Sequence, residues 1–146
     1  MTENAGEKHL IFTIQDRRYA LPSKIINEVE VLEKVFPLPL VPEYVRGFIN
    51  RYSIPYALID TDFLLSGSLS EAQKVIVLKQ EIDTLALLID DVTDIAYPSS
   101  EELMKSEVNE TEFSILVSAF FEWKGSQVFC LNTEEIISRI KQDFGQ

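Results

Sequence analysis

Hydrophobic residues gather in short runs rich in β-branched and aromatic side chains, and polar breaks separate these runs. Examples are HLIFTI (9–14), KVIVL (74–78) and SQVFCL (126–131). Residues typical of tight turns follow or join such runs at QDRR (15–18), Glu81–Asp83 and Lys124-Gly125. Short strands separated by polar turns indicate β-hairpins, so the pattern predicts a mainly β protein with three hairpins.

Two further stretches carry their own patterns. In KIINEV (24–29), Ile25, Ile26 and Val29 have the i, i+1, i+4 spacing of one helix face, which predicts a short helical turn. In ALIDTDF (57–63) hydrophobic and polar positions alternate, which predicts a strand running toward Leu65. The loop SGSLSEAQ (66–73) then follows.

Prolines and one strong helix pattern complete the organisation. Pro37, Pro39 and Pro42 exclude a central strand or a helix interior and indicate an extended, edge-like path. Near the end of the chain, Asn132 can cap a helix with Glu135 three positions on. The predicted inner face of that helix consists of Ile136, Ile137, Ile140 and Phe144.

The length of 146 residues and the 46% hydrophobic content favour one compact unit with a sizeable core. We expect residues 1–8 to be a flexible polar tail and residues 9–146 to form a single domain of two β-subdomains. Many short strands of this kind are typical of small barrels or a sandwich.

The net charge of −11 argues against binding to nucleic acid or to anionic lipid. No signal peptide and no apolar run of membrane-spanning length is present, so we expect no membrane insertion. A single cysteine, Cys130, excludes an intrachain disulfide and fits a reducing compartment. These features predict a cytoplasmic protein.

Candidate chemistry is sparse. His9 and Cys130 are the only residues of their kinds, and we interpret them as a rim residue and a core residue. The aspartates at 60, 62, 90, 91 and 94 do not match a calcium loop, and the glycines form no nucleotide-binding motif. We therefore predict no enzyme activity, no catalytic residue, no cofactor and no metal. A small enzyme or ligand-binding barrel remains the alternative, and a deep polar pocket with a perturbed carboxylate would indicate it.

The ordered set of segments resembles the CheW-like domain of bacterial chemotaxis. The counterparts are HLIFTI and YALP, IINEV (25–29), LVPEYVRGFIN (40–50) with RYSIPYALIDTDFLL, KVIVLKQEIDTLALLIDDVTDI, and SQVFCLNTEEII. They correspond to the family's first strand pair, its V-x-E-V/I turn, its G-V-I-N-L-R-G-x-I-V-P-V-I-D-L segment and its later strands and helix. The resemblance covers residues 9 to about 141.

The sequence departs from the family pattern in three places. Arg51-Tyr52-Ser53 stands where the family has Leu-Arg-Gly, and Ala57 replaces the proline of V-P-V, with Pro55 two positions earlier. The glycine of the family's G-x-x-V-D is Ala86 or Leu87 here. The family's Arg and Gly in that turn are among the residues linked to partner contacts, so these departures imply a divergent member with altered partner choice or a weakened interaction.

The resemblance implies two packed SH3-like five-stranded β-barrels with a C-terminal helix. It also implies a non-enzymatic adaptor that couples the cytoplasmic tips of chemoreceptors to the regulatory domain of the histidine kinase CheA. A CheW-like scaffold in another motility or phosphorelay pathway is the alternative, favoured by the missing Leu-Arg-Gly. The residues expected to contact partners are Ile26, Glu28, Val29, Asn50, Arg51 and Tyr52.

Overall fold

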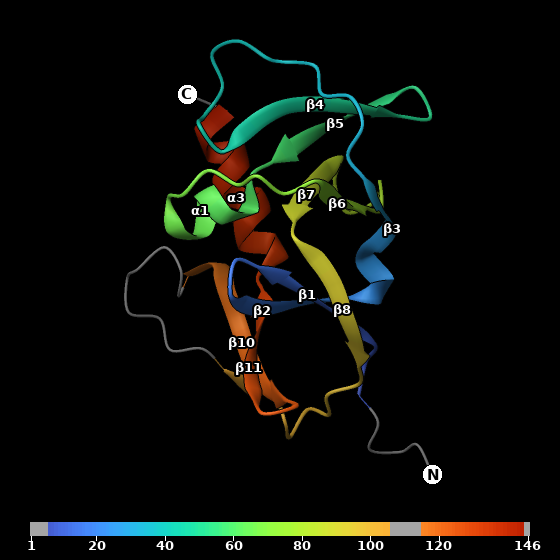
Figure 1. The fold of residues 1–146 in the computed structure, drawn as a ribbon, viewed down its shortest axis with the longest axis vertical. Coiled ribbons are helices and arrows are strands. Elements are labelled where there is room, and N and C mark those ends of the chain that lie inside the picture. Colours follow the sequence, from blue (N-terminus) through green and yellow to red (C-terminus); the bar gives the residue numbers. More distant parts are fainter. Residues whose placement is uncertain (1–5, 106–114, 145–146) are drawn as a thin grey trace.

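The computed structural model describes residues 6–105 and 115–144, which form two packed β-sheets and the helices that join or cover them (Figure 1). One sheet is six-stranded with the order β8-β1-β2-β11-β10-β9. Its strands are β1 (His9–Ile14), β2 (Arg17–Pro22), β8 (Asp91–Ala96), β9 (Met104–Lys105), β10 (Val117–Trp123) and β11 (Ser126–Leu131). The antiparallel pairs β1–β2 and β10–β11 are two of the predicted hairpins.

The other sheet is five-stranded with the order β3-β6-β7-β5-β4. Its strands are β3 (Ile26–Val31), β4 (Val45–Arg51), β5 (Ile54–Ile59), β6 (Lys74–Leu78) and β7 (Leu85–Ile89). The pair β6–β7 is the third predicted hairpin. In the part of the chain that the structure describes, neither sheet is closed by backbone pairing of its two edge strands.

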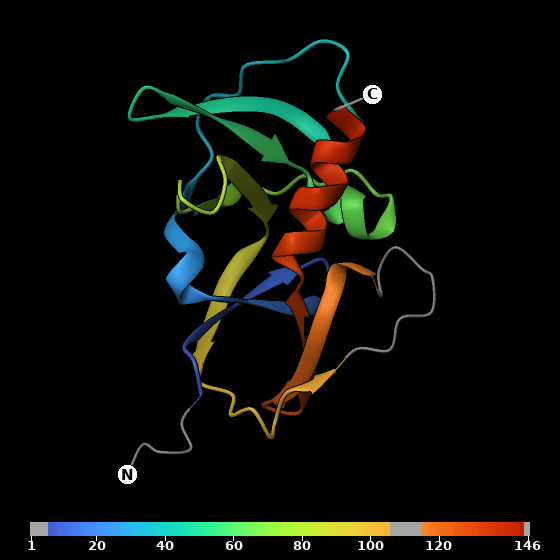
Figure 2. The ribbon, with the colours of Figure 1, turned by 180° about the vertical axis from the view of Figure 1, so that it is seen from behind.

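Helix α3 (Thr133–Phe144) runs from the six-stranded sheet toward the five-stranded one, as the view from behind shows (Figure 2). Its residues Ile136 and Ile140 are buried in a core that also takes Phe12 from one sheet and Ile76 from the other. Burying each such side chain stabilises the fold by about 1.5–3 kcal/mol. The two sheets therefore share one hydrophobic core, and the predicted mainly β fold with a C-terminal helix is confirmed. The expected five-stranded barrels are instead two open sheets, one of six strands and one of five.

The cap predicted for this helix is present. The side-chain oxygen of Asn132 accepts a hydrogen bond from the backbone N–H of Glu135 at 3.1 Å, satisfying one of the free donors of the first turn. Phe144, predicted to share the inner face, is 45% exposed at the last position of the helix.

The helical turn predicted at 25–29 is wrong. Only Ser23–Ile25 form a short 3-10 turn, and residues 26–31 continue as strand β3. The run INEVEV alternates half-buried and exposed positions, and pairing with β6 satisfies its backbone groups. Five residues of helical spacing are too few to oppose that sheet pairing.

The strand predicted through ALIDTDF is also wrong beyond Ile59. Residues Thr61–Ser66 form helix α1. The helix begins there because the Asp60 carboxylate accepts a hydrogen bond from the backbone N–H of Phe63 at 3.1 Å. The aspartate three residues ahead of an apolar run was the sequence signal for this helix.

The run TLALLIDDVTDIAY contains two strands that belong to different sheets. Strand β7 ends at Ile89 in the five-stranded sheet, and β8 begins at Asp91 and pairs with β1 in the six-stranded sheet. Between them the backbone N–H of Asp90 donates to the carbonyl of Thr13. The chain thus passes from one sheet to the other within a single residue.

Candidate functional site

The residues expected to contact partners lie on β3 and on the turn between β4 and β5. Ile26 is half-buried and packs against the shared core, whereas Val29 is 38% exposed on the outer face of β3. Glu28 is half-buried, and Asn50 is exposed near the end of β4. Although β3 and β4 are the two opposite edges of the five-stranded sheet, side chains from both meet at this turn.

The β4–β5 turn is a two-residue hairpin loop of Tyr52 and Ser53, flanked by the pair Arg51 and Ile54. Both loop residues have positive φ, 52° and 66°, as a type I′ turn requires. This conformation normally selects Asn-Gly, and it is unfavourable for a bulky residue. Tyr52 is 80% exposed, so its side chain does not pack down on the barrel.

Arg51 joins the two edge strands. Its guanidinium donates to Glu28 Oε1 from Nε at 3.1 Å and from Nη2 at 2.9 Å, and Nη2 lies 2.6 Å from Glu30 Oε2. The three side chains are 23–29% exposed. We call Glu28, Glu30 and Arg51 the edge clasp, because side chains here connect strands that the backbone leaves unpaired.

The edge clasp also affects its own charges and its neighbour. Burial raises the pKa of Glu30, and the adjacent Glu28 adds to this while Arg51 opposes it. The hydrogen bond to Glu28 raises the pKa of Arg51. The same guanidinium lies over the Tyr52 ring at 5.5 Å, which restrains the exposed aromatic side chain. The cluster therefore places the exposed Tyr52 ring beside one net negative charge.

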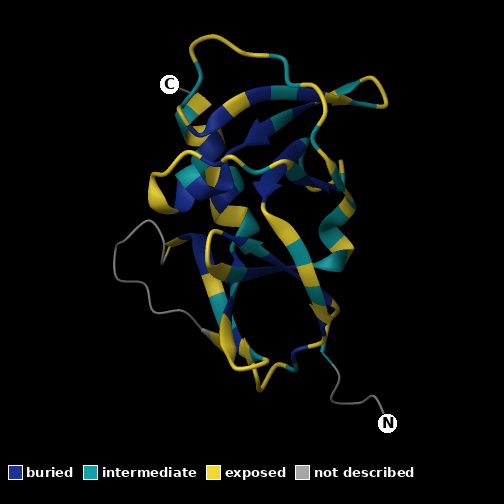
Figure 3. Ribbon diagram, viewed as in Figure 1, coloured by how far each residue is buried: buried dark blue, intermediate teal, exposed yellow. Residues whose placement is uncertain are grey.

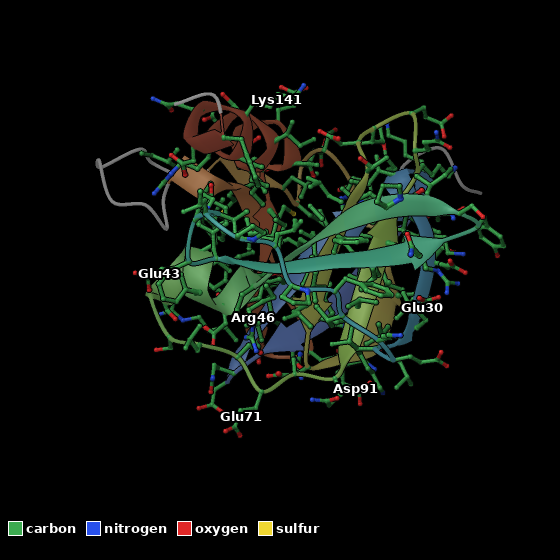
Figure 4. All side chains as sticks on the ribbon, turned by 90° about the horizontal axis from the view of Figure 1, so that it is seen from above. Glu30, Glu43, Arg46, Glu71, Asp91 and Lys141 are labelled. Atoms are coloured by element: carbon green, nitrogen blue, oxygen red, sulfur yellow. The ribbon has the colours of Figure 1, made fainter. Side chains whose placement is uncertain are left out.

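A second ion pair lies toward the other end of β4, where Figure 4 shows Arg46 well apart from Glu30. Arg46 Nη1 donates to the buried Asp60 carboxylate at 2.8 Å, and the backbone N–H of Ser70 donates to the same oxygen at 3.0 Å. Asp60 is thus the residue that caps α1 and fixes the following loop. Both oxygens of the Asp60 carboxylate accept hydrogen bonds from within the protein, which indicates a structural role for this residue.

The other acidic candidates are likewise bound to donors of the protein. Asp62 accepts from Gln15 and Ser66, Asp90 from the backbone of Gln15, Asp91 from Lys74, and Asp94 from Lys124. Across residues 6–105 and 115–144, no group of three or more His, Cys, Asp or Glu side chains is arranged to hold a metal ion.

His9 and Cys130 are both buried. His9 Nδ1 donates to the carbonyl of Glu7 at 2.8 Å, and its ring meets the edge of Phe121. Burial raises the pKa of Cys130 to about 11, so this thiol remains protonated near neutral pH and is a poor nucleophile.

A cavity of about 240 Å³ beside the edge clasp is lined by Glu30 and Arg51 together with Leu32, Glu33, Lys34, Phe36, Ile49 and Asn50. Glu30 is a carboxylate with a perturbed pKa, as the alternative of a small enzyme would require. The lining of the cavity includes no Ser, Thr, Cys or His, so it contains no hydroxyl, thiol or imidazole that Glu30 could activate, and its one amine is that of Lys34. The Glu30 carboxylate is also already ion-paired with Arg51.

A family model described as CheW-like domain matches residues 8–141. Among curated proteins, the chemotaxis protein CheW of Klebsiella aerogenes is 25% identical over 104 residues. That match covers 69% of this chain and 63% of the Klebsiella protein, so it spans less than two thirds of that relative.

Among solved structures, the scaffolding protein TtCheW of Thermoanaerobacter tengcongensis superimposes with a TM-score of 0.79 at 15% identity, covering 87% of this chain and 89% of the other. At that identity the likeness shows the shared fold. In the residues that the structure describes, no helix is long and apolar enough to cross a membrane.

Proposed function

Because the chain belongs to the CheW-like domain family, we propose that it is a cytoplasmic, non-enzymatic scaffold that couples chemoreceptor tips to the regulatory domain of the histidine kinase CheA. The observation that carries this proposal is the family match over residues 8–141, which extends across both sheets. The names of the Klebsiella and Thermoanaerobacter relatives, a chemotaxis protein and a scaffolding protein, point the same way.

The surface proposed for the contact consists of Ile26, Glu28, Val29, Asn50, Arg51 and Tyr52. Tyr and Arg are frequent energetic anchors of protein interfaces, because each buries a large surface while keeping polar groups available. Tyr52 is exposed and held by Arg51, so little side-chain freedom is lost when a partner covers it. The carboxylates of the edge clasp would add charge selectivity.

Titration calorimetry of the intact protein with a CheA regulatory domain tests this proposal. We expect Tyr52→Ala to weaken binding by about 1–3 kcal/mol without lowering the melting temperature, because the side chain is mostly outside the fold. Glu28→Lys should weaken binding by about 1–3 kcal/mol through charge reversal, with some loss of stability because it breaks the edge clasp.

Asp94→Lys is the matched control. Asp94 is also an edge-strand carboxylate paired with a basic turn residue, but it lies in the six-stranded sheet. Its charge reversal should leave kinase binding unchanged. Wild-type affinity in a folded Tyr52→Ala protein would show that the β4–β5 turn is an ordinary surface loop.

A CheW-like scaffold of another motility or phosphorelay pathway is the second candidate. The observation that favours it is Arg51-Tyr52-Ser53 in place of the family's Leu-Arg-Gly, at the turn proposed to face the partner. A chain that binds neither a CheA regulatory domain nor a receptor tip, but captures a different histidine kinase identified by mass spectrometry, would support this candidate over the first.

A further inference from the structure

The loop between β3 and β4 covers the outer edge of β4, the side that faces away from β5, before it arches over the top of the molecule (Figure 1). Figure 3 shows it exposed or half-buried over most of its length, whereas β6 and β7 of the same sheet are buried. Its backbone is fixed at two points. The N–H of Leu32 donates to the carbonyl of Gln73 at 2.7 Å, and the N–H of Val45 donates to the carbonyl of Pro42 at 2.9 Å. We call the residues between these points, 33–41, the strap.

Between its fixed ends the strap is bonded to the sheet at one place. Phe36 and Phe48 of β4 exchange two backbone hydrogen bonds of 2.8 Å, and their rings stack at 5.0 Å. The bridge is isolated, since no further pair of described residues extends it along the seven-residue strand β4. A segment with few backbone bonds and an exposed path opens locally at a fraction of the free energy of global unfolding.

The strap has a cavity on each of its two sides. One is the 240 Å³ cavity beside the edge clasp, and the other, of about 760 Å³, reaches the buried core residues Leu58 and Leu88. Leu32 lines both cavities, while Phe36 lines the first and Val35 lines the second. Lifting the strap would therefore join the two cavities into one groove along β4.

The closed position of the strap depends on a glycine and on a strained leucine. Gly47 has a φ of +135°, and a Cβ there would lie 2.3 Å from the Phe36 carbonyl oxygen, so only glycine lets the strap reach β4. Leu40 has a φ of +56°, although its side chain is fully exposed. A leucine adopts this left-handed region only at a cost in free energy. Opening can relieve that cost, and it breaks a single bridge.

We propose that the strap is a local conformational device, which opens and closes over the outer edge of β4 while both sheets stay folded. When open, it exposes the backbone of Phe48 and the joined groove, and when closed it covers both. Asn50 and Arg51 of the proposed partner surface line the smaller cavity, so the position of the strap sets the shape of the surface beside the edge clasp. The device does not depend on which partner binds there.

Amide hydrogen exchange of the full chain, followed by NMR, is the test, because the N–H groups of Phe36 and Phe48 are bonded only through the bridge. In the wild type we expect both to have the same protection and to exchange roughly 100-fold or more faster than the slowest amides of β6 and β7, with no dependence on low concentrations of urea. Protection equal to that of β6 and β7 would show that the strap opens only with global unfolding, and would overturn the proposal.

Gly47→Ala should hold the strap open, since the added methyl group cannot share the space of the Phe36 carbonyl. The amides of Phe36 and Phe48 should then lose nearly all protection, while those of β6 and β7 remain protected. Gly67→Ala is the matched control, because Gly67 also has a positive φ, +79°, but nothing lies within 4 Å of an added Cβ. It introduces similar backbone strain and should leave exchange at Phe36 and Phe48 unchanged.

A second variant leaves β4 untouched, in case Gly47→Ala does not fold. Phe36→Pro removes both the N–H that donates to Phe48 and the ring that stacks on it, in a loop that already contains three prolines. The Phe48 amide should again lose its protection, with β6 and β7 unchanged. Retained protection of Phe48 in either folded variant, or an equal loss in Gly67→Ala, would overturn the proposal.

Discussion

Two hairpin turns of this protein both have positive φ values at their two loop residues, but only one of them has residues that suit this conformation. The β10–β11 turn places Lys124 and Gly125 at φ values of 49° and 81°, and the β4–β5 turn places Tyr52 and Ser53 at 52° and 66°. Glycine in the first turn meets the conformational requirement at little cost. The second turn has a tyrosine and a serine at positions that favour Asn-Gly.

Each turn also carries a basic residue that reaches an edge strand of its own sheet. Lys124 contacts Asp94 of β8 at 3.1 Å with its side chain 63% exposed, whereas Arg51 contacts two carboxylates of β3 and is 29% exposed. Lysine makes a flexible point contact, and arginine makes a directional one with several donors. The β10–β11 turn is thus an ordinary connection, whereas the β4–β5 turn is tied to the opposite edge strand and projects an aromatic side chain.

The largest expected difference between the two turns is the loss of stability when the basic residue of each is removed. We expect Arg51→Ala to lower the free energy of unfolding by about 2–3 kcal/mol, because Glu28 and Glu30 are left together without their shared cation. Lys124→Ala should leave it nearly unchanged. Urea unfolding measures both, and equal losses would contradict the comparison.

A variant that replaces Arg51 and Tyr52 together would combine two different effects. The cost belongs to Arg51, which the edge clasp holds, and Tyr52 contributes little because it is 80% exposed. The single variants should therefore show separately that Arg51→Ala lowers stability and that Tyr52→Ala lowers binding, which the double variant cannot do.

Giving the β4–β5 turn the preferred residues should make the two turns alike. Tyr52→Asn with Ser53→Gly is expected to raise the free energy of unfolding by about 1 kcal/mol, since both left-handed positions become favourable. Lys124→Asn is the matched variant of the other turn, and it should raise the free energy of unfolding by less, because Gly125 already suits its left-handed position and only one residue is improved. A thermal melt that drops for the Asn-Gly variant would show that Tyr52 supports the fold.

The smallest expected difference is in pH dependence. The raised pKa of Glu30 means that its contribution to stability is present below its ordinary pKa of 4.5 and is lost as pH rises through the raised value. The hydrogen bond from Lys124 lowers the pKa of Asp94, so its contribution is present above 3.8 and is lost as pH falls through the lowered value.

Urea midpoints measured from pH 3 to pH 7 should therefore change in opposite directions in Glu30→Gln and Asp94→Asn, relative to the wild type. Glu30→Gln should remove a decline that occurs with rising pH, and Asp94→Asn should remove one that occurs with falling pH. Parallel curves for the two variants would mean that burial does not raise the pKa of Glu30 in the folded protein.

The sequence by itself determined the elements whose signals are local. The three hairpins follow from apolar runs around turn residues, and α3 follows from its inner face and from Asn132 three positions before Glu135. These patterns suffice because each involves neighbours in the chain, and the ordered set of them also carried the resemblance to the family.

Only the tertiary structure decided where distant segments meet. Pairing with β6 made β3 a strand against its helical spacing. The cap of α1 is local to Asp60, but only the tertiary structure brings Arg46 and Ser70 to the other oxygen of that carboxylate. The edge clasp depends on the curvature that brings the two edges of one sheet together, and Glu28 and Arg51, 23 residues apart, meet only there. Such contacts depend on the packing of segments that are far apart in the chain, and a local sequence pattern does not specify that packing.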